Sequence, residues 1–408
     1  MKPQLLISRA RLDDLCLTVV DCPHSTPVWT ENGALVLRSQ NIRGGRLDLS
    51  TKSFTDEDHY RHRSRRAEVC AGDIVITREA PMGEVCMIPS GLRCCLGQRM
   101  VLLRPNALKC DGRYLLYALQ SQHLQEQISW SEGTGSTVSN LRVPHLKALL
   151  VPTPSMKQQE EIGSVLGALD NKIEQNRRTA QALERLAQAI FRAWFVDFEP
   201  VKAKAAGATA FPSMPQLVFD ALPTRFVASD IGPVPQGWEV LRLDGLLTLQ
   251  RGFDLPKQSR SEGSHPILAA SGLNGVHSEW KVKGPGVTTG RSGVLGQVFF
   301  VECNFWPLNT SLWVKEYKRS NSWHAYFLLQ TLDLAQFNAG SAVPTLNRNH
   351  VHSLPIVAPP HSLLEAFERI CSLTFSLDRQ TRDESDKLSA MRDYLLPKLL
   401  SGTVRVAA

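Results

Sequence analysis

The chain contains one unit of sequence twice, and this repeat constrains its fold more than any other feature. The stretch at 135–141 (Gly-Ser-Thr-Val-Ser-Asn-Leu) matches the stretch at 340–346 (Gly-Ser-Ala-Val-Pro-Thr-Leu) without a gap. Three further groups match, each with equal spacing in the two copies. His145 and Leu149 match His350 and Leu354, and Arg11-Leu12-Asp13 matches Arg242-Leu243-Asp244. The third group is Arg78, Gly83 and Val85, which match Arg291, Gly296 and Val298. We therefore expect two similar domains.

A long helical pattern follows each copy. Ser155 with Gln158, and Ser362 with Glu365, read as capping boxes that start the two helices. Apolar or small side chains then recur in steps of three and four, as in a coiled-coil seam. The two seams are Ile162, Leu166, Leu169, Ile173, Asn176, Ala180, Leu183, Ala187, Ile190 and Trp194, and Leu363, Phe367, Ile370, Thr374, Leu377, Thr381, Glu384, Leu388, Met391 and Leu395.

Both seams turn polar or small in the middle, at Asn176 and Ala180 in one and at Thr381 and Glu384 in the other. If the helices pair antiparallel, these centres meet and fix the register. The alternative is two separate amphipathic helices, each packed on its nearest domain.

The globular copies alternate short β-rich runs with one short helical piece. The clearest β-rich runs are 73–77 and 296–301, and the helical pieces lie near 114–122 and 322–332. The predicted fold class is α+β, with two mixed α/β domains in a pseudo-two-fold arrangement, separated by two long antiparallel coiled-coil helices. The predicted boundaries are 1–154 for the first domain, 155–199 for the central helix, 200–230 for a linker, 231–360 for the second domain and 361–408 for the C-terminal helix.

The net charge and the cysteine content indicate which kind of partner and which cellular compartment to expect. A net charge of +7 favours a polyanionic partner such as nucleic acid. Nine cysteines, an odd number without a Cys-x-x-Cys pair, indicate reduced and mostly buried thiols. No apolar run approaches the roughly 20 residues of a membrane span, so we expect a cytoplasmic protein without a membrane partner.

The sequence offers no convincing catalytic constellation. Residues 358–361 (Ala-Pro-Pro-His) contain two prolines but lack the polar and aromatic ends that a base-flipping amino-methyltransferase needs. Glu316-Tyr317-Lys318 is a lone acidic pattern, and no Gly-rich phosphate loop is present. We predict no catalytic residue, no metal site and no bound cofactor.

Basic and amide-bearing loops are the candidate DNA contacts, because Arg reads guanine, Asn and Gln read adenine, and other cations position phosphates. In the first copy the candidates are Arg38, Asn41, Arg43, Arg46, Arg61, Arg63, Arg65, Arg66 and Arg78. In the second copy they are Arg251, Lys257, Arg260, Asn274, His277 and Arg291. The alternative for the 59–66 cluster is a solvated surface paired with Asp56, Glu57 and Asp58. Arg78 and Arg291 are either phosphate clamps or buried ion pairs with an acid.

Several segments resemble one family. Residues 232–240, with Pro235-Gln236-Gly237-Trp238 at their centre, resemble the opening motif of the recognition domains of type I restriction-modification DNA-specificity subunits. Residues 72–78, 290–296 and 305–310 resemble internal segments of that family, and Pro154 with Gln159 and Ile162 resembles its junction into the spacer helix. The first copy lacks the Pro-x-Gly-Trp motif, and Leu364 replaces the junction glutamine in the second.

The resemblance implies that each copy is a target recognition domain and that the long helices pair as a spacer. It implies a non-catalytic subunit that reads a bipartite double-stranded DNA target, docks two adenine-modification subunits and joins ATP-dependent restriction subunits. One competing hypothesis is a self-contained DNA methyltransferase or nuclease with degenerate motifs. Another is a coiled-coil scaffold without a nucleic-acid role, which leaves the duplicated domains unexplained.

Overall fold

The computed structural model describes residues 8–130, 140–340 and 343–406. The chain divides into two compact units, which we call unit 1 (Met1–Arg177 with Asp383–Ala408) and unit 2 (Arg178–Arg382). Each unit holds one copy of the sequence repeat and a part of each long helix.

Unit 1 is built on a four-stranded antiparallel sheet in the order β2-β10-β7-β8. A smaller sheet in the order β6-β3-β9 contains one parallel pair, β3 with β9, and β1 pairs with β11. The strands are β1 (Arg9–Arg11), β2 (Cys16–Asp21), β3 (Ala34–Leu37), β4 (Ile42–Arg43), β5 (Arg46–Leu47), β6 (Phe54–Thr55), β7 (Ile74–Thr77), β8 (Val85–Met87), β9 (Cys94–Leu96), β10 (Met100–Pro105) and β11 (Leu150–Pro152). The helices are α1 (Leu12–Leu15), α2 (Glu57–Arg63), α3 (Gly112–Gln120), α4 (Gln122–Ser129) and α5 (Val143–Ala148).

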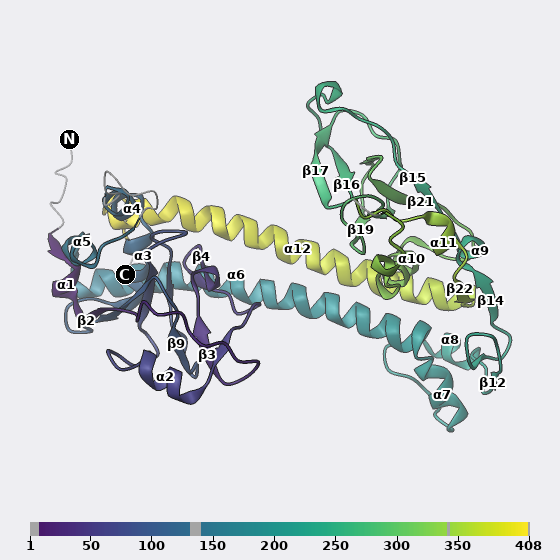
Figure 1. Ribbon diagram of the computed structural model, residues 1–408, viewed down its shortest axis with the longest axis horizontal. Helices are drawn as coiled ribbons and strands as arrows, with labels where there is room; N and C mark the ends of the chain where they lie inside the picture. Colours follow the sequence, from purple (N-terminus) through teal and green to yellow (C-terminus); the bar gives the residue numbers. More distant parts are fainter. Residues whose placement is uncertain (1–7, 131–139, 341–342, 407–408) are drawn as a thin grey trace. The chain divides into compact units, whose positions relative to one another are not determined.

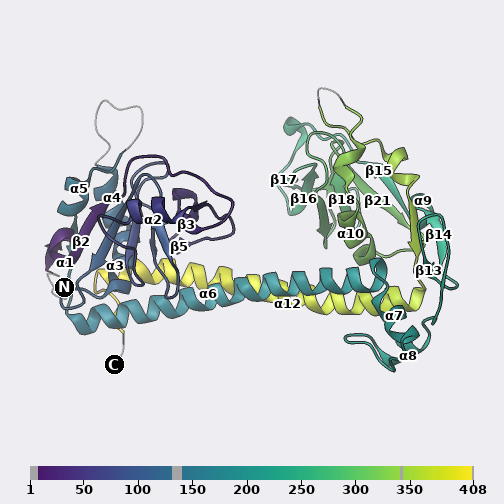
Figure 2. The same ribbon diagram turned by 60° about the horizontal axis from the view of Figure 1, so that its bottom comes forward.

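Unit 2 repeats this topology. Its four-stranded sheet has the order β15-β21-β18-β19, its smaller sheet β17-β16-β20 again contains one parallel pair, and β14 pairs with β22. The strands are β12 (Phe226–Val227), β13 (Val234–Pro235), β14 (Glu239–Arg242), β15 (Leu247–Arg251), β16 (His265–Ala269), β17 (Gly272–His277), β18 (Gly286–Gly290), β19 (Val298–Val301), β20 (Trp306–Pro307), β21 (Ser311–Tyr317) and β22 (Pro355–Ala358). The helices are α9 (Leu243–Leu246), α10 (Ser322–Thr331) and α11 (Arg348–His352), and Figure 2 shows α10 against the larger sheet.

Hydrogen bonds confirm the alignment of the two copies residue by residue. The Leu12 N–H donates to the Leu149 carbonyl (2.9 Å), as the Leu243 N–H does to the Leu354 carbonyl (2.8 Å). The Leu141 N–H donates to the Arg78 carbonyl (3.0 Å), as the Leu346 N–H does to the Arg291 carbonyl (2.8 Å). Parts of the matched motifs, residues 135–139 and 341–342, lie outside the described residues.

The two long helices are α6 (Met156–Phe191) and α12 (His361–Leu400), and each contributes to both units. In unit 1 the first part of α6 pairs antiparallel with the last part of α12, where Asp170 contacts Arg392 and Asn176 contacts Glu384. Figure 1 shows these helix segments beside the sheets of unit 1. In unit 2, Phe191 at the end of α6 and Trp194 in the π-helical turn that follows it (Arg192–Val196) pack on Phe367 of α12. The antiparallel pairing is therefore present within each unit.

The polar residues in the middle of the two seams meet as predicted. The Asn176 amide donates to Glu384 Oε2 (2.8 Å), and Lys172 pairs with the same oxygen (3.1 Å). The seam of α6 is buried or half-buried throughout. The seam predicted for α12 is wrong in part, since Leu377 and Met391 are 47% and 51% exposed. The helix instead buries Cys371 toward its own domain, because it packs on a sheet domain as well as on α6.

One helix start differs from the prediction. Ser155 and Gln158 form the expected reciprocal cap on α6, with N–H to side-chain distances of 3.2 and 3.4 Å. By contrast, α12 begins at His361, and the Pro360 carbonyl accepts from Leu363 and Leu364. Ser362 therefore lies inside the first turn rather than before it.

The segment 200–230 is not the linker that its small, polar composition predicted. It contains α7 (Glu199–Ala205) and α8 (Gln216–Asp220), and Val201 and Phe219 are buried in the core of unit 2. The Lys204 ammonium donates to the carbonyls of Phe219, Asp220 and Leu222, which ties the two helices together. A few well-spaced apolar side chains thus order a segment whose average composition suggested flexibility.

Candidate nucleic-acid interface

Two of the predicted DNA-contact residues are built into the fold of unit 1. Asn41 is buried, its amide donates to the carbonyls of Asp48 and Thr51 (2.9 and 2.8 Å), and its Oδ1 accepts from the Arg38 N–H. Arg63 is also buried, and its guanidinium donates to the carbonyls of Leu96, Ser25 and Pro23. Burial lowers the pKa of Arg63. Both side chains donate their polar hydrogens to backbone carbonyls. They therefore hold neighbouring segments of the chain in place and do not extend into solvent.

The repeated arginines Arg78 and Arg291 both donate to residues of neighbouring loops. Arg78 donates from Nε to the Leu141 carbonyl (2.9 Å) and from its terminal nitrogen to the Asn140 side chain (3.1 Å). Arg291 donates to the Asn309 carbonyl (3.0 Å). The acceptors are two carbonyls and an amide oxygen, so neither arginine forms the buried ion pair with an acid that was one alternative. Each arginine instead holds loop residues next to the larger sheet of its unit.

Arg46 belongs to a polar node between the β4–β5 hairpin and the long helices of unit 1. Asp170 of α6 accepts from Arg46 (2.9 Å), from Arg392 of α12 (2.8 Å) and from the Tyr117 hydroxyl of α3 (2.7 Å). Burial and the Asp170 carboxylate raise the pKa of Tyr117, which keeps its hydroxyl a donor. We call these four residues the Asp170 node, and Arg46 acts there as a structural residue.

The exposed cations of unit 1 gather on and after α2. Asp56 caps this helix by accepting from the His59 N–H (2.8 Å), and the basic residues Arg61 and His62 stand in the last turn, where the helix dipole favours positive charge. Arg61 lies 3.5 Å from Glu57, and Arg66 pairs with Asp21. Arg65 is exposed, as is Arg43 in the β4–β5 hairpin, while Arg38 lies 5.2 Å from the Trp29 ring.

Sequence reasoning missed two arginines of the same unit. Arg93 forms a bidentate pair with Glu57 and lies 4.2 Å from the centre of the Tyr60 ring. Arg99 is exposed in the turn between β9 and β10, 3.0 Å from Glu79. Arg93 stands 36 residues along the chain from Glu57, so only the packing of β9 beside α2 brings it to that helix.

In unit 2 the predicted residues divide in the same way. His277 is buried, its Nδ1 accepts from the Ser261 N–H (3.1 Å), and its ring packs edge-on against Trp306. Arg260 donates to both the carbonyl and the side chain of Asn274 (2.8 and 2.9 Å), which ties the segment before β16 to β17. Arg251, 3.5 Å from Asp254, and Lys257 are exposed.

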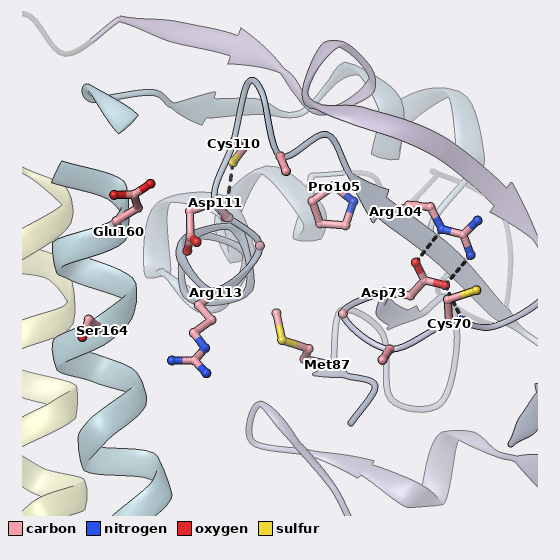
Figure 3. Close-up of a pocket in the computed structure, with 14 residues that line it drawn as sticks. Cys70, Asp73, Met87, Arg104, Pro105, Cys110, Asp111, Arg113, Glu160 and Ser164 are labelled. Carbon is pink, nitrogen blue, oxygen red and sulfur yellow. Dashed lines mark hydrogen bonds and ion pairs between the residues drawn. The ribbon is translucent and has the colours of Figure 1, made fainter. Parts of the chain in front are cut away.

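A cavity of about 620 Å³ lies in unit 1 between the larger sheet, the start of α3 and one face of α6. Figure 3 shows Glu160 and Ser164 on α6 at one side, Arg113 near the middle and the Asp73–Arg104 pair at the other side. Asp73 is buried and is already bound by Arg104 (2.8 Å) and by the Cys70 N–H (2.8 Å). Its carboxylate is therefore engaged in structure. The described residues contain no group of three His, Cys, Asp or Glu side chains placed to hold a metal ion.

The cysteines are free thiols, as the sequence predicted, and six of the nine are buried. Burial raises the pKa of Cys86 and Cys94 to about 12, so both thiols stay protonated and unreactive. Across residues 8–130, 140–340 and 343–406, no helix combines the length and apolar character that crossing a bilayer requires.

The chain thus contains a duplicated α+β unit and a pair of long helices, with cations exposed on each copy. The family model for the type I restriction modification DNA specificity domain matches residues 58–185. The chain is 26% identical to the specificity subunit of type I restriction enzyme MjaIX from Methanocaldococcus jannaschii, over 82% of this chain and 78% of that one. It is 23% identical to the HindI specificity subunit from Haemophilus influenzae, over 75% and 80%.

A crystal structure of a type I restriction-modification S subunit from M. genitalium has the same fold, with a TM-score of 0.61, 18% identity and 98% coverage of both chains. This likeness confirms the α+β class. In sequence the chain is similar to type I restriction-modification DNA-specificity subunits over most of its length. The relatives are named specificity subunits, which are non-catalytic components of type I restriction-modification complexes, and this agrees with the prediction that this chain is not itself an enzyme.

Proposed function

We propose that this chain reads a bipartite double-stranded DNA sequence, one short block per unit, and directs adenine methylation and restriction by partner subunits. The observation that carries the proposal is the duplication of one fold with different exposed side chains at equivalent places. Equal frameworks give equal docking on DNA, and different side chains give different base preferences. The proposed recognition domains are the sheet domains of units 1 and 2.

The proposed phosphate contacts are those cations among the predicted residues that the fold leaves exposed. They are Arg38, Arg43, Arg61, Arg65 and Arg66 in unit 1, and Arg251 and Lys257 in unit 2. Asn41, Arg46, Arg63, Arg78, His277 and Arg291 instead shape the loops that carry the reading residues. Arg260 and Asn274 hold each other, so we assign them to the contact between β17 and the segment before β16.

The proposed protein partners are two modification subunits, with restriction subunits joining the core. The long helices carry exposed large apolar side chains at Leu186, Leu373, Leu377 and Met391. Exposed apolar surface of this kind is a feature of protein interfaces, and we propose these helix faces as docking sites for the modification subunits. The methyl donor and ATP would then bind in the partners. A function on cellular DNA places the complex in the cytoplasm.

Methylome sequencing of cells with and without this gene tests the proposal. We expect one bipartite adenine-methylation motif to disappear with the gene and to return with a plasmid copy. Unchanged methylation in a cell whose modification subunit is active would refute it. The purified chain incubated alone with DNA and methyl donor tests the alternative of a self-contained methyltransferase, and we expect no transfer.

A further inference from the structure

Arg99 occupies a backbone conformation that does not suit an arginine. It lies between β9 and β10 with φ +65°, in the left-handed region that favours glycine. Its carbonyl accepts from the Arg78 N–H (2.8 Å), which ties the turn to the end of β7. Strained backbone at a surface turn often accompanies a functional side chain, because a glycine there would cost less free energy.

The side chain of Arg99 is exposed yet positioned. It is 57% exposed, and its Nε lies 3.0 Å from Glu79 Oε2. Glu79, which is 17% exposed, accepts from the Asn140 amide through its other oxygen (2.6 Å), and Asn140 accepts from the buried Arg78 (3.1 Å). This chain of contacts runs from the core of unit 1 to the guanidinium. Among the described residues the terminal amino groups of Arg99 have no bonding partner.

Unit 2 has a different residue at the equivalent place. There the Arg291 N–H donates to the Thr310 carbonyl (2.8 Å), as Arg78 does to Arg99. Thr310 is short and neutral, and its hydroxyl accepts from the Ala270 N–H (3.4 Å). The framework contact is shared by both units, and the projecting guanidinium belongs to unit 1.

We propose that Arg99 reads a guanine in the DNA block recognised by unit 1, with Glu79 and Asn140 as its positioning residues. This inference rests on the proposed function. A guanidinium held at Nε keeps two terminal N–H groups in a fixed plane, which suits the O6 and N7 acceptors of guanine in the major groove. Arg61 is held less closely, with its Nε 3.5 Å from Glu57 and 73% of its side chain exposed, and Arg66 pairs with Asp21 through a terminal nitrogen. They suit phosphates, which need charge more than fixed direction.

Arg99→Gly separates a reading role from a structural one, because glycine adopts the same φ without strain and should fold at least as well. The full-length variant is expressed with its modification subunit, and the methylated motif is sequenced. We expect one G·C pair in one block to relax by about 10-fold in preference, with the other block unchanged. Arg65→Ala is the matched control, and we expect weaker methylation at all sites without relaxation of any base.

Four outcomes would overturn the inference. Arg99→Gly that leaves every position of the motif as selective as before shows that Arg99 reads no base. A uniform loss across all sites, in a variant with an unchanged melting temperature, assigns Arg99 to a phosphate. Relaxation in both blocks shows that it acts on the whole subunit. If the unmodified protein directs no bipartite motif at all, the proposed function fails first and the inference falls with it.

Discussion

The two units attach their sheet domains to the long helices by different chemistry at the same place. Asp111 and Asn321 cap α3 and α10, so Tyr117 and Phe327, six residues later, are equivalent. In unit 1 Tyr117 donates to Asp170 within the Asp170 node. In unit 2 Phe327 lies near Phe375 (6.2 Å between ring centres), which stacks on Trp323 (4.4 Å).

The junction residues of α6 and α12 differ in the same way. In unit 1 the buried Gln159 accepts from the Asp111 N–H (3.0 Å) and donates to the Pro154 carbonyl (2.9 Å). In unit 2 Leu364 replaces this glutamine, and the Asn321 side chain donates to the Leu364 carbonyl (3.2 Å). One fold therefore accepts either directed polar contacts or stacked rings, provided that each junction is complete in itself. The polar junction depends on charge and geometry, and the aromatic one depends on volume.

The largest expected effect is on the aromatic junction. Phe327→Ala removes a buried ring that contacts Phe191, Phe367 and Phe375. The cavity should cost unit 2 about 4 kcal/mol. Hydrogen exchange followed by mass spectrometry, with peptides from each unit, measures the loss.

The matched control is Tyr117→Phe at the equivalent place in unit 1. It removes only a hydroxyl, and we expect a cost of about 1 kcal/mol. Equal losses for the two variants would show that the junctions do not differ as described.

The next effect concerns the polar junction. Asp170→Ala leaves Arg46, Arg392 and the Tyr117 hydroxyl without their common acceptor. Since Asp170 is 19% exposed, we expect unit 1 to lose about 3 kcal/mol, toward the lower end for buried pairs. Faster amide exchange should appear in the β4–β5 hairpin and in α3.

The control for that variant is Lys157→Ala, which breaks an i,i+4 pair between the 76% exposed lysine and Glu161 on α6. A pair of this kind contributes about 0.5 kcal/mol. Were both substitutions to have equally small effects, the Asp170 node would be an ordinary surface pair.

The smallest expected effect is a difference between the two units in how their stability depends on pH. Burial lowers the pKa of His324 in unit 2 from its ordinary 6.5 to about 3, whereas the equivalent residue of unit 1 is Tyr114. The unfolded chain therefore binds a proton between pH 6.5 and 3 that the folded unit does not. The stability of unit 2 is complete above pH 6.5 and should fall by about 2 kcal/mol between pH 7 and pH 5.

Denaturant titrations of the full chain, combined with unit-resolved hydrogen exchange, measure this dependence. His324→Gln removes the titrating group and should flatten the response of unit 2. A pH response that persists in this variant would assign the effect to other groups.

Much of the fold was open to prediction because it depends on local spacing. The repeat appeared as matched residues at equal separation, and the structure aligns them through the same hydrogen bonds, such as Leu141 to Arg78 and Leu346 to Arg291. The α6 seam, the cap at Ser155 and the meeting of Asn176 with Glu384 also followed from the helical period alone.

The candidate site was less open to prediction, because the partner of a polar side chain depends on residues far away in the sequence. Arg63 binds carbonyls about 30 to 40 residues distant, and Arg46 binds Asp170, 124 residues further on. Nothing near either arginine in the chain indicates these partners. The cationic cluster was therefore visible in the sequence, but not which of its members remain free.

What the sequence determined by itself is the duplicated α+β plan, the two long helices and the family, since each follows from periodicity, spacing or resemblance. The tertiary structure alone decided that 200–230 joins a core, that Leu377 and Met391 are exposed, and that Arg99 projects while Arg63 and Arg78 do not. The physical reason is the same in each case. Burial and hydrogen bonding depend on which surfaces meet in three dimensions. Only the side chains that the fold itself does not bury or bond remain available to contact a partner such as DNA.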